Sequence, residues 1–174
     1  MPKLKKMYSD ISNPHIQQMM RIIETQSKQT LVNWCCDYAE KQILPIYQEH
    51  FPDDKRPQVA VSAARDCLAG KIRLPEAKKL ILACHEAARE AENNSAAQAA
   101  ARAAGQAASS IHTATHALGI AFYGAMAVAY NKVANETQEV YNRLAEEELA
   151  GIENSLRAVC VENEPNPVKV NWNC

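Results

Sequence analysis

The chain has 174 residues, of which 29 are alanine, 13 are glycine or proline and 10 are aromatic. So few turn-forming and aromatic residues argue against a sandwich or barrel of short strands, whereas abundant alanine, the best helix former, favours long helices. The net charge of −1, from 19 basic and 20 acidic residues, gives no general attraction to nucleic acid or to an anionic membrane.

The first predicted helices are marked by their caps and by apolar residues at helical spacing. Asn13 followed by Pro14 is a good helix start, because asparagine caps well and proline fits the first helical turn. A second helix is predicted from about Gln29. Pro45 lies within its apolar pattern and should kink or split it, since proline removes a donor and clashes with the preceding turn. Residues 51–54 form a loop that ends in a capping aspartate.

Turn and cap residues also delimit the next helices. A third helix should span 55–69 and end at Gly70, a natural left-handed cap. Pro75 starts another helix, with an acidic residue in its first turn, where the helix dipole favours negative charge. Ser95 is the expected cap of the helix that follows it, over 96–110.

The second half of the chain is also predicted to be helical. Residues 112–132 continue the helical pattern after two serines, and one bent helix or two separate helices over 95–132 both remain open. The last helix is predicted over 135–159. Residues 161–174 are rich in proline and asparagine and should form an irregular tail, with a short extended piece at 168–170.

These elements predict an all-α fold, a single-domain bundle of about six to seven mostly antiparallel helices over residues 1–160. Twelve of the alanines lie between Ala87 and Ala108, and alanine lets a neighbouring backbone approach closely. We therefore place 96–110 and 113–129 at the centre as an alanine-rich helix pair, although the first of them could also be an exposed helix. Three glycines along this pair indicate close helix crossings or, alternatively, kinks: Gly105, Gly119 and Gly124.

No segment has the pattern of an export signal or a membrane span. Residues 1–10 lack an apolar run of signal-peptide length. The most apolar stretch, 114–134, is dominated by alanine and holds His116, Asn131 and Lys132, which indicates a buried helix. The six cysteines form no C-x-x-C pair and are expected to be reduced thiols, which favours a cytoplasmic protein.

Arg102 lies on the alanine-rich segment that we expect at the centre of the bundle. A buried guanidinium needs a carboxylate or several acceptors. Asp66, Glu86 and Glu90 are the candidate partners for a structural ion pair. A functional contact with an anion is the alternative.

Two histidines, His112 and His116, are four residues apart and should share one helix face with Tyr123. The spacing suits a metal, with residues 84–86 as candidates for further ligands, but Thr113 stands where a zincin has its catalytic glutamate. The other interpretation is two histidines that are hydrogen-bonded within the bundle. No nucleophile elbow, phosphate loop or dinucleotide motif is present, so we predict no enzymatic activity, no metal and no cofactor.

Charged residues are unevenly distributed along the chain. Residues 136–164 hold eight acidic side chains against Arg143 and Arg157, and form either a solvated helix face or a surface for a basic partner. Five basic residues between 55 and 90 are more typical of solvated helix ends than of an anion site: Lys55, Arg56, Arg65, Arg73 and Arg89.

Several segments carry a family resemblance. They are Trp34–Tyr47, Asp54–Pro57 with Ala63–Arg65, His85–Arg89 and, most distinctive, Ala100–Gln106 followed by Ile111–Gly119 and Tyr123. Together these segments, within about residues 30–130, resemble the family of bacterial immunity proteins that accompany polymorphic toxins. The resemblance implies an all-α cytoplasmic protein that binds and blocks a cognate toxin and has no catalysis of its own.

The sequence therefore predicts a non-enzymatic immunity protein that neutralises a cognate bacterial toxin, with neither nucleic acid nor a membrane as partner. The candidate pocket or partner-binding residues are Arg65, Arg102, His112, His116 and Tyr123. One alternative is a bundle that binds a metal or small molecule through the two histidines. Another is a structural homo-oligomer in which an alanine face packs between subunits.

Overall fold

The computed structural model describes residues 3–173, and over them the fold is all-α, as predicted, with no β-sheet and one isolated bridge between Ser27 and Pro167. The helices in chain order are α1 (Pro14–Ile23), α2 (Lys28–Tyr38), α3 (Leu44–His50), α4 (Arg56–Leu68), α5 (Leu74–Glu90), α6 (Ser95–Ser109), α7 (Ala125–Lys132) and α8 (Gln138–Val159). Three short helical turns complete the set: η1 (Ala39–Ile43), η2 (Ala114–Leu118) and η3 (Ile120–Gly124).

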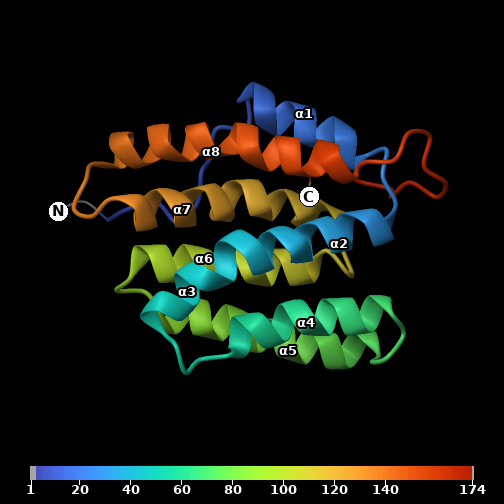
Figure 1. The fold of residues 1–174 in the computed structure, drawn as a ribbon, viewed down its shortest axis with the longest axis horizontal. Helices are drawn as coiled ribbons and strands as arrows, with labels where there is room; N and C mark the ends of the chain where they lie inside the picture. Colours follow the sequence, from blue (N-terminus) through green and yellow to red (C-terminus); the bar gives the residue numbers. More distant parts are fainter. Residues whose placement is uncertain (1–2, 174) are drawn as a thin grey trace.

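The helices stack side by side in one bundle (Figure 1). The pair α1 and α8 forms one edge, α4 and α5 form the opposite edge, and α2, α6 and α7 lie between them. This order places the alanine-rich helix between the two edges of the molecule.

Helix α6 is the centre of the bundle, as the alanine pattern predicts. Eleven of its 15 residues are buried, nine of them alanines, and it packs against α2, α3, α4, α5 and α7. The alternative of an exposed alanine-rich helix is therefore wrong. The chain's own helices also cover the alanine face that we considered as a contact between subunits.

The expected disturbance at Pro45 is a π-helical turn rather than a break. The chain is helical from α2 through η1 into α3, and Pro45 stands in the first turn of α3. The N–H of Leu44 donates to the carbonyl of Ala39, five residues back, so the ladder widens just before the residue that has no N–H. A widened turn removes the clash between the proline ring and the preceding carbonyl.

The helical run predicted over 112–132 begins two residues later and is not regular α-helix throughout. His112 lies in a turn and Thr113 is extended, and η2, η3 and α7 then follow one another from Ala114 to Lys132. Ser110 supports the turn, because its hydroxyl donates to the carbonyl of Ala107 at 2.6 Å. Residues 95–132 therefore form two separate helical segments, α6 and the run from η2 to α7, rather than one bent helix.

The predicted helix ends are mostly confirmed. The side chain of Asn13 accepts the N–H of His15, and Gly70 has the positive φ of 74° that a left-handed cap requires. Asn94, not Ser95, caps α6, since its side chain accepts the N–H of Ala97 at 3.0 Å. The last helix begins at Gln138, three residues later than predicted.

The tail is irregular, as predicted, and it is fastened to the turn between α1 and α2. The Gln26 amide exchanges two hydrogen bonds with the backbone of Val161, and the N–H of Val168 donates to the Gln26 carbonyl at 2.8 Å. Glu164 accepts from the hydroxyls of Ser27 and Thr30. These contacts hold the end of the chain against the bundle without a strand.

Three of the five described cysteines are small core residues, and none of the five is bonded to another. Cys35, Cys36 and Cys84 are buried, whereas Cys67 and Cys160 are half-buried. The apolar stretch over 114–134 is also largely interior, and no described helix is both long enough and apolar enough to cross a bilayer.

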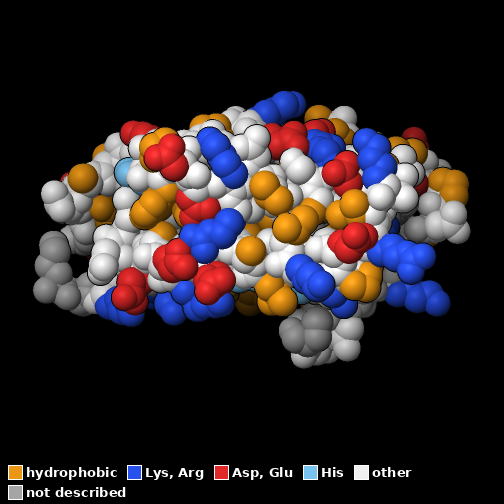
Figure 2. Space-filling model, turned by 90° about the horizontal axis from the view of Figure 1, so that it is seen from below, with side chains coloured by type: hydrophobic (Ala, Val, Ile, Leu, Met, Phe, Trp, Pro, Cys, Tyr) orange, Lys and Arg blue, Asp and Glu red, His pale blue; other side chains and the backbone are white. Residues whose placement is uncertain are grey.

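The outer face of α4 and α5 keeps some apolar side chains at the surface. Val59 is 40% exposed and Leu82 is 65% exposed. Figure 2, which views the bundle from this side, shows apolar side chains along the middle of the face with both charge signs around them. Scattered apolar side chains of this kind are common on protein surfaces.

Substitution by alanine at Gly119 and at Gly151 should change the free energy of unfolding in opposite directions. A Cβ at Gly119 would lie 2.4 Å from the Cβ of Gln106, so Gly119→Ala should lower the free energy of unfolding by about 1–3 kcal/mol. Gly151 is exposed inside α8 with nothing within 4 Å of the added atom, so Gly151→Ala should raise it by about 1 kcal/mol. Urea unfolding of both variants checks this, and equal effects would contradict the packing at Gly119.

Candidate functional site

Arg102 has no counter-ion in the described part of the chain. Asp66 instead lies 3.7 Å from the Lys71 ammonium, Glu90 binds Arg56, and Glu86 is exposed without an ion pair. The predicted structural ion pair of Arg102 is therefore wrong, because its candidate partners pair with other groups or with solvent. The Nε atom of Arg102 is buried and has no hydrogen-bond partner.

Three polar side chains form a stripe along one face of α6. Gln98, Arg102 and Gln106 are spaced by four residues, so they lie one above the other. Gln98 Nε2 donates to the carbonyl of Ala88 on α5 at 2.8 Å, which directs this end of the stripe toward α5. The alanines between these residues fill the interior, so the stripe is the polar side of a helix that is otherwise apolar.

His85 of α5 lies directly against α6 at Gly105. A Cβ at Gly105 would be 2.6 Å from the Cε1 atom of His85 and 2.8 Å from its Nδ1 atom. Glycine is needed here for the close approach of an imidazole ring, rather than for a helix crossing or a kink. The packing of α5 on α6 thus brings His85 near Arg102, which the spacing of residues along either helix does not predict.

His116 is oriented by the stripe. Its Nδ1 atom lies 2.8 Å from the Oε1 atom of Gln106. Because an amide oxygen only accepts, the Nδ1 atom carries the proton, which leaves the Nε2 atom as the acceptor of the neutral ring. Gln106 is in turn held against Gly119, whose missing side chain leaves room for it.

His112 completes the cluster from the turn after α6. Its ring centroid lies 5.5 Å from that of His116, edge to face, and its Nδ1 atom is 2.9 Å from the hydroxyl of Thr113. The two rings are close, as predicted, although they do not share a helix face. The turn and the 3-10 helix η2, rather than helical spacing, bring them together.

Burial lowers the pKa of all three histidines, and positive neighbours lower the pKa of His85 and His112 further. Burial is the largest cause for each of them, and Arg102 is the next cause for His85. His112 is next lowered by His116 and then by Lys78. No carboxylate contributes to any of these shifts. The charged and titratable groups that act within the cluster are all cationic or neutral: Lys28, Lys78, His85, Arg89, Arg102, His112 and His116.

The metal interpretation of the histidines finds no support in the geometry. No group of three or more His, Cys, Asp or Glu side chains is placed to hold a metal ion within residues 3–173. Cys84, considered as a further ligand, is buried and donates its thiol to the carbonyl of Ala101 at 3.2 Å. Burial raises the pKa of this thiol to about 12, so it stays protonated.

Arg65 and Tyr123 are not joined to the cluster by any polar contact. Arg65 on α4 binds Asp37 and Glu40 in an ion-pair network that ties α4 to α2 and η1. Tyr123 lies on η3, half-buried against the core, with no hydrogen bond to a described residue. Of the predicted site residues, the structure brings together Arg102, His112 and His116.

Sequence reasoning missed Gln106 and Lys78 as members of this site. Gln106 follows Arg102 by four residues, so the helical period itself is a signal that the two share a face. The approach of Lys78 to His112 has no such signal, because it depends on how α5 packs beside the turn after α6.

A family model described as "Imm-5 like putative immunity protein" matches residues 21–150. This range contains α2 to α7, most of α8 and every member of the histidine–arginine cluster. A search of curated proteins and a search of solved structures both give no match.

The lowered histidine pKa values predict that acid weakens the fold. In the unfolded chain these histidines gain protons as the pH falls toward their ordinary pKa of about 6.5, before they do so in the folded protein. The free energy of unfolding should therefore fall between about pH 8 and about pH 5.5. His112→Gln should make this fall shallower, as measured by urea unfolding across the pH series.

His50→Gln is the matched control, because His50 is an exposed histidine on α3, outside the cluster. This variant should keep the pH dependence of the parent. A chain that gains stability on acidification over this range would contradict the burial of the neutral rings.

Proposed function

The chain belongs to the Imm-5-like family of immunity proteins, and we propose that it binds a cognate toxin protein and blocks it without catalysing a reaction itself. The single observation that carries this proposal is the family match over residues 21–150, most of the chain. The function needs a surface that a toxin recognises, rather than a set of reacting groups.

The state of the nucleophilic side chains supports a binding role. Burial raises the pKa of Cys36 and of Cys84 to about 12, so both are unreactive thiols at neutral pH. His112 and His116 contact Thr113 and Gln106 rather than a cysteine or serine that they would activate.

We propose the first half of α8 as the contact surface. The acidic residues of 136–164 divide into two groups in the structure. Glu148 pairs with Lys132, and Glu153 pairs with His15 and Arg157 where α1 covers the second half of α8. Glu146 accepts from the hydroxyl of Tyr8, and Glu164 accepts from Ser27 and Thr30, so four of the eight carboxylates are used within the chain.

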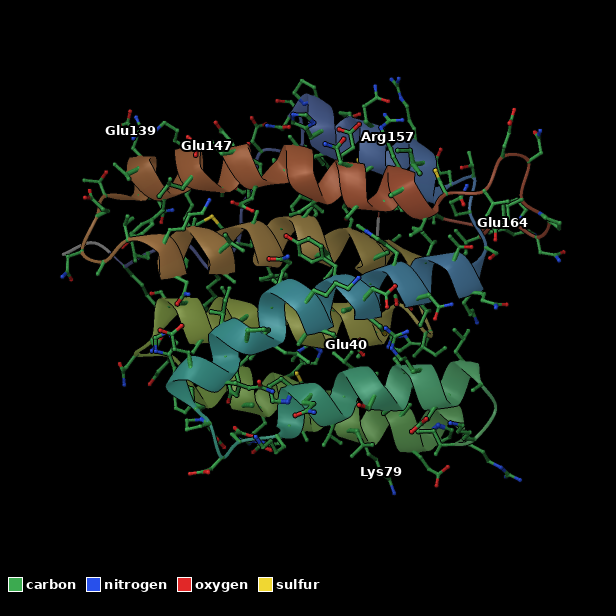
Figure 3. The ribbon with its side chains drawn as sticks, in the orientation of Figure 1. Glu40, Lys79, Glu139, Glu147, Arg157 and Glu164 are labelled. Atoms are coloured by element: carbon green, nitrogen blue, oxygen red, sulfur yellow. The ribbon has the colours of Figure 1, made fainter. Side chains whose placement is uncertain are left out.

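The other group is directed to solvent. Glu136, Glu139 and Glu147 are exposed, and their carboxylates have neither a hydrogen bond nor an ion pair with a described residue. Figure 3 shows Glu139 and Glu147 on the outer side of α8, away from the other helices. Arg143 lies between Glu139 and Glu147 on the same face, so this surface carries an excess of negative charge rather than charge of one sign. Such an excess on an uncovered helix attracts a basic partner and speeds its association.

A hollow of about 930 Å³ opens beside this acidic surface. It is lined by the α7–α8 connection, residues 130–138, together with the start of α6 and Tyr141. Its lining holds Glu49 and Glu136 together with Lys3 and Lys132, so it carries both charge signs. The acidic stretch of α8 therefore borders a concave surface that can accept a side chain of a toxin.

Co-expression with the toxin encoded beside this gene tests the proposal. The chain should restore growth to cells that produce the toxin, and the two purified proteins should bind each other. Glu139→Lys with Glu147→Lys should weaken that binding by about tenfold or more at low salt, since like charges then face each other.

The matched control is Glu86→Lys with Glu92→Lys, which reverses two exposed acids away from α8 that have no partner in the described residues. It should bind the toxin as the parent does. Persistent toxicity with the parent chain would overturn the function, whereas equal binding by both double variants would overturn only the contact surface.

A further inference from the structure

We propose that Arg102, His85, His112 and His116 form a binding site for an oxyanion, the group that carboxylates and phosphates share. The site lies between α5, α6 and η2, whereas the acidic surface of α8 lies at the opposite edge of the bundle (Figure 1). It is independent of the toxin contact proposed above.

The first argument is the convergence of hydrogen-bonding groups from three parts of the chain. Gly105 lets the ring of His85 lie against α6, one turn from Arg102. Gln106 holds the Nδ1 atom of His116 at 2.8 Å, and the His116 ring meets that of His112 edge to face. The fold thus gathers three imidazoles and one guanidinium on one side of α6.

The second argument is that these groups keep hydrogen-bonding capacity for a ligand. The Nε atom of Arg102 is buried without an acceptor, and its guanidinium has no carboxylate partner within residues 3–173. His85 makes no hydrogen bond with any described residue. Gln106 contacts only the Nδ1 atom of His116, and Thr113 contacts only the Nδ1 atom of His112, so the Nε2 atom of each ring remains for a ligand. A planar guanidinium and imidazolium N–H groups are donors that suit carboxylate and phosphate oxygens.

The third argument is the sign of the surrounding charge. Arg102 of α6 and Arg89 of α5 act electrostatically on His85, and Lys78 of α5 and Lys28 of α2 act on His112. No acidic side chain of residues 3–173 contributes to the pKa shifts of the three rings. This field repels a metal cation and attracts an anion. A bound anion would favour the protonated rings, so binding should take up protons and strengthen as the pH falls.

Titration with inorganic phosphate, at an ionic strength held constant with chloride, tests the site. Phosphate should shift the ring signals of His85, His112 and His116 in a saturable manner and raise their apparent pKa values, while those of His15 and His50 stay unchanged. Calorimetry should show tighter binding at about pH 6 than at about pH 8. Acetate in a parallel titration separates a preference for carboxylate from one for phosphate, and saturable binding of either supports the proposal.

Arg102→Gln should weaken the binding by about tenfold or more, because it removes the charged fork. Arg143→Gln, on the exposed side of α8, is the matched control and should bind as the parent does. His112→Gln is the second variant if Arg102→Gln does not fold, and it should weaken the binding as well.

The absence of a saturable shift in the parent chain with both anions would overturn the site. Equal binding by the parent, Arg102→Gln and His112→Gln would also overturn it. Because no toxin is used, either result leaves the proposed immunity function to its own test.

Discussion

The structure depends on the burial of α6, a helix whose side chains are almost all methyl groups. Five helices pack against α6, since alanine keeps neighbouring backbones close and loses no side-chain entropy on burial. A helix of this kind has little side-chain bulk of its own. The large apolar residues of the core therefore come from the surrounding helices, among them Trp34, Ile43, Met126 and Leu149.

This constraint also determines where polar groups can stand on α6. Gln98, Arg102 and Gln106 occupy the one face where the packing of α5 leaves an outlet. Two of them find partners, the carbonyl of Ala88 and the ring of His116, whereas Arg102 does not. An unsatisfied buried donor is unfavourable by about 1–3 kcal/mol, and groups of this kind concentrate where proteins bind ligands.

The sequence predicted the features that depend on the intrinsic preferences of neighbouring residues. Asn13, Gly70 and the alanine run have strong intrinsic preferences, and the structure confirms the cap, the left-handed turn and the central helix. It did not predict that Arg102 has no carboxylate partner within residues 3–173, because Asp66 and Glu90 pair with Lys71 and Arg56 instead. The closeness of His112 and His116 was predicted from helical spacing, yet it arises from a turn and a 3-10 helix.

Acidic and basic side chains are nearly equal in number over the whole chain, but they gather in different parts of the bundle. The exposed acids lie on α8, at one edge of the bundle, whereas the cationic groups around His85 lie on α5, at the opposite edge, and on the neighbouring α6. Over such a distance, charges on the surface are largely screened from one another at physiological salt, so each surface keeps its own field. The packing of α6 also shapes the cationic side, because the missing side chains of Gly105 and Gly119 leave the space that His85 and Gln106 occupy. A site held in this way needs little reorganisation when an anion arrives, which is the condition under which a few polar groups bind selectively.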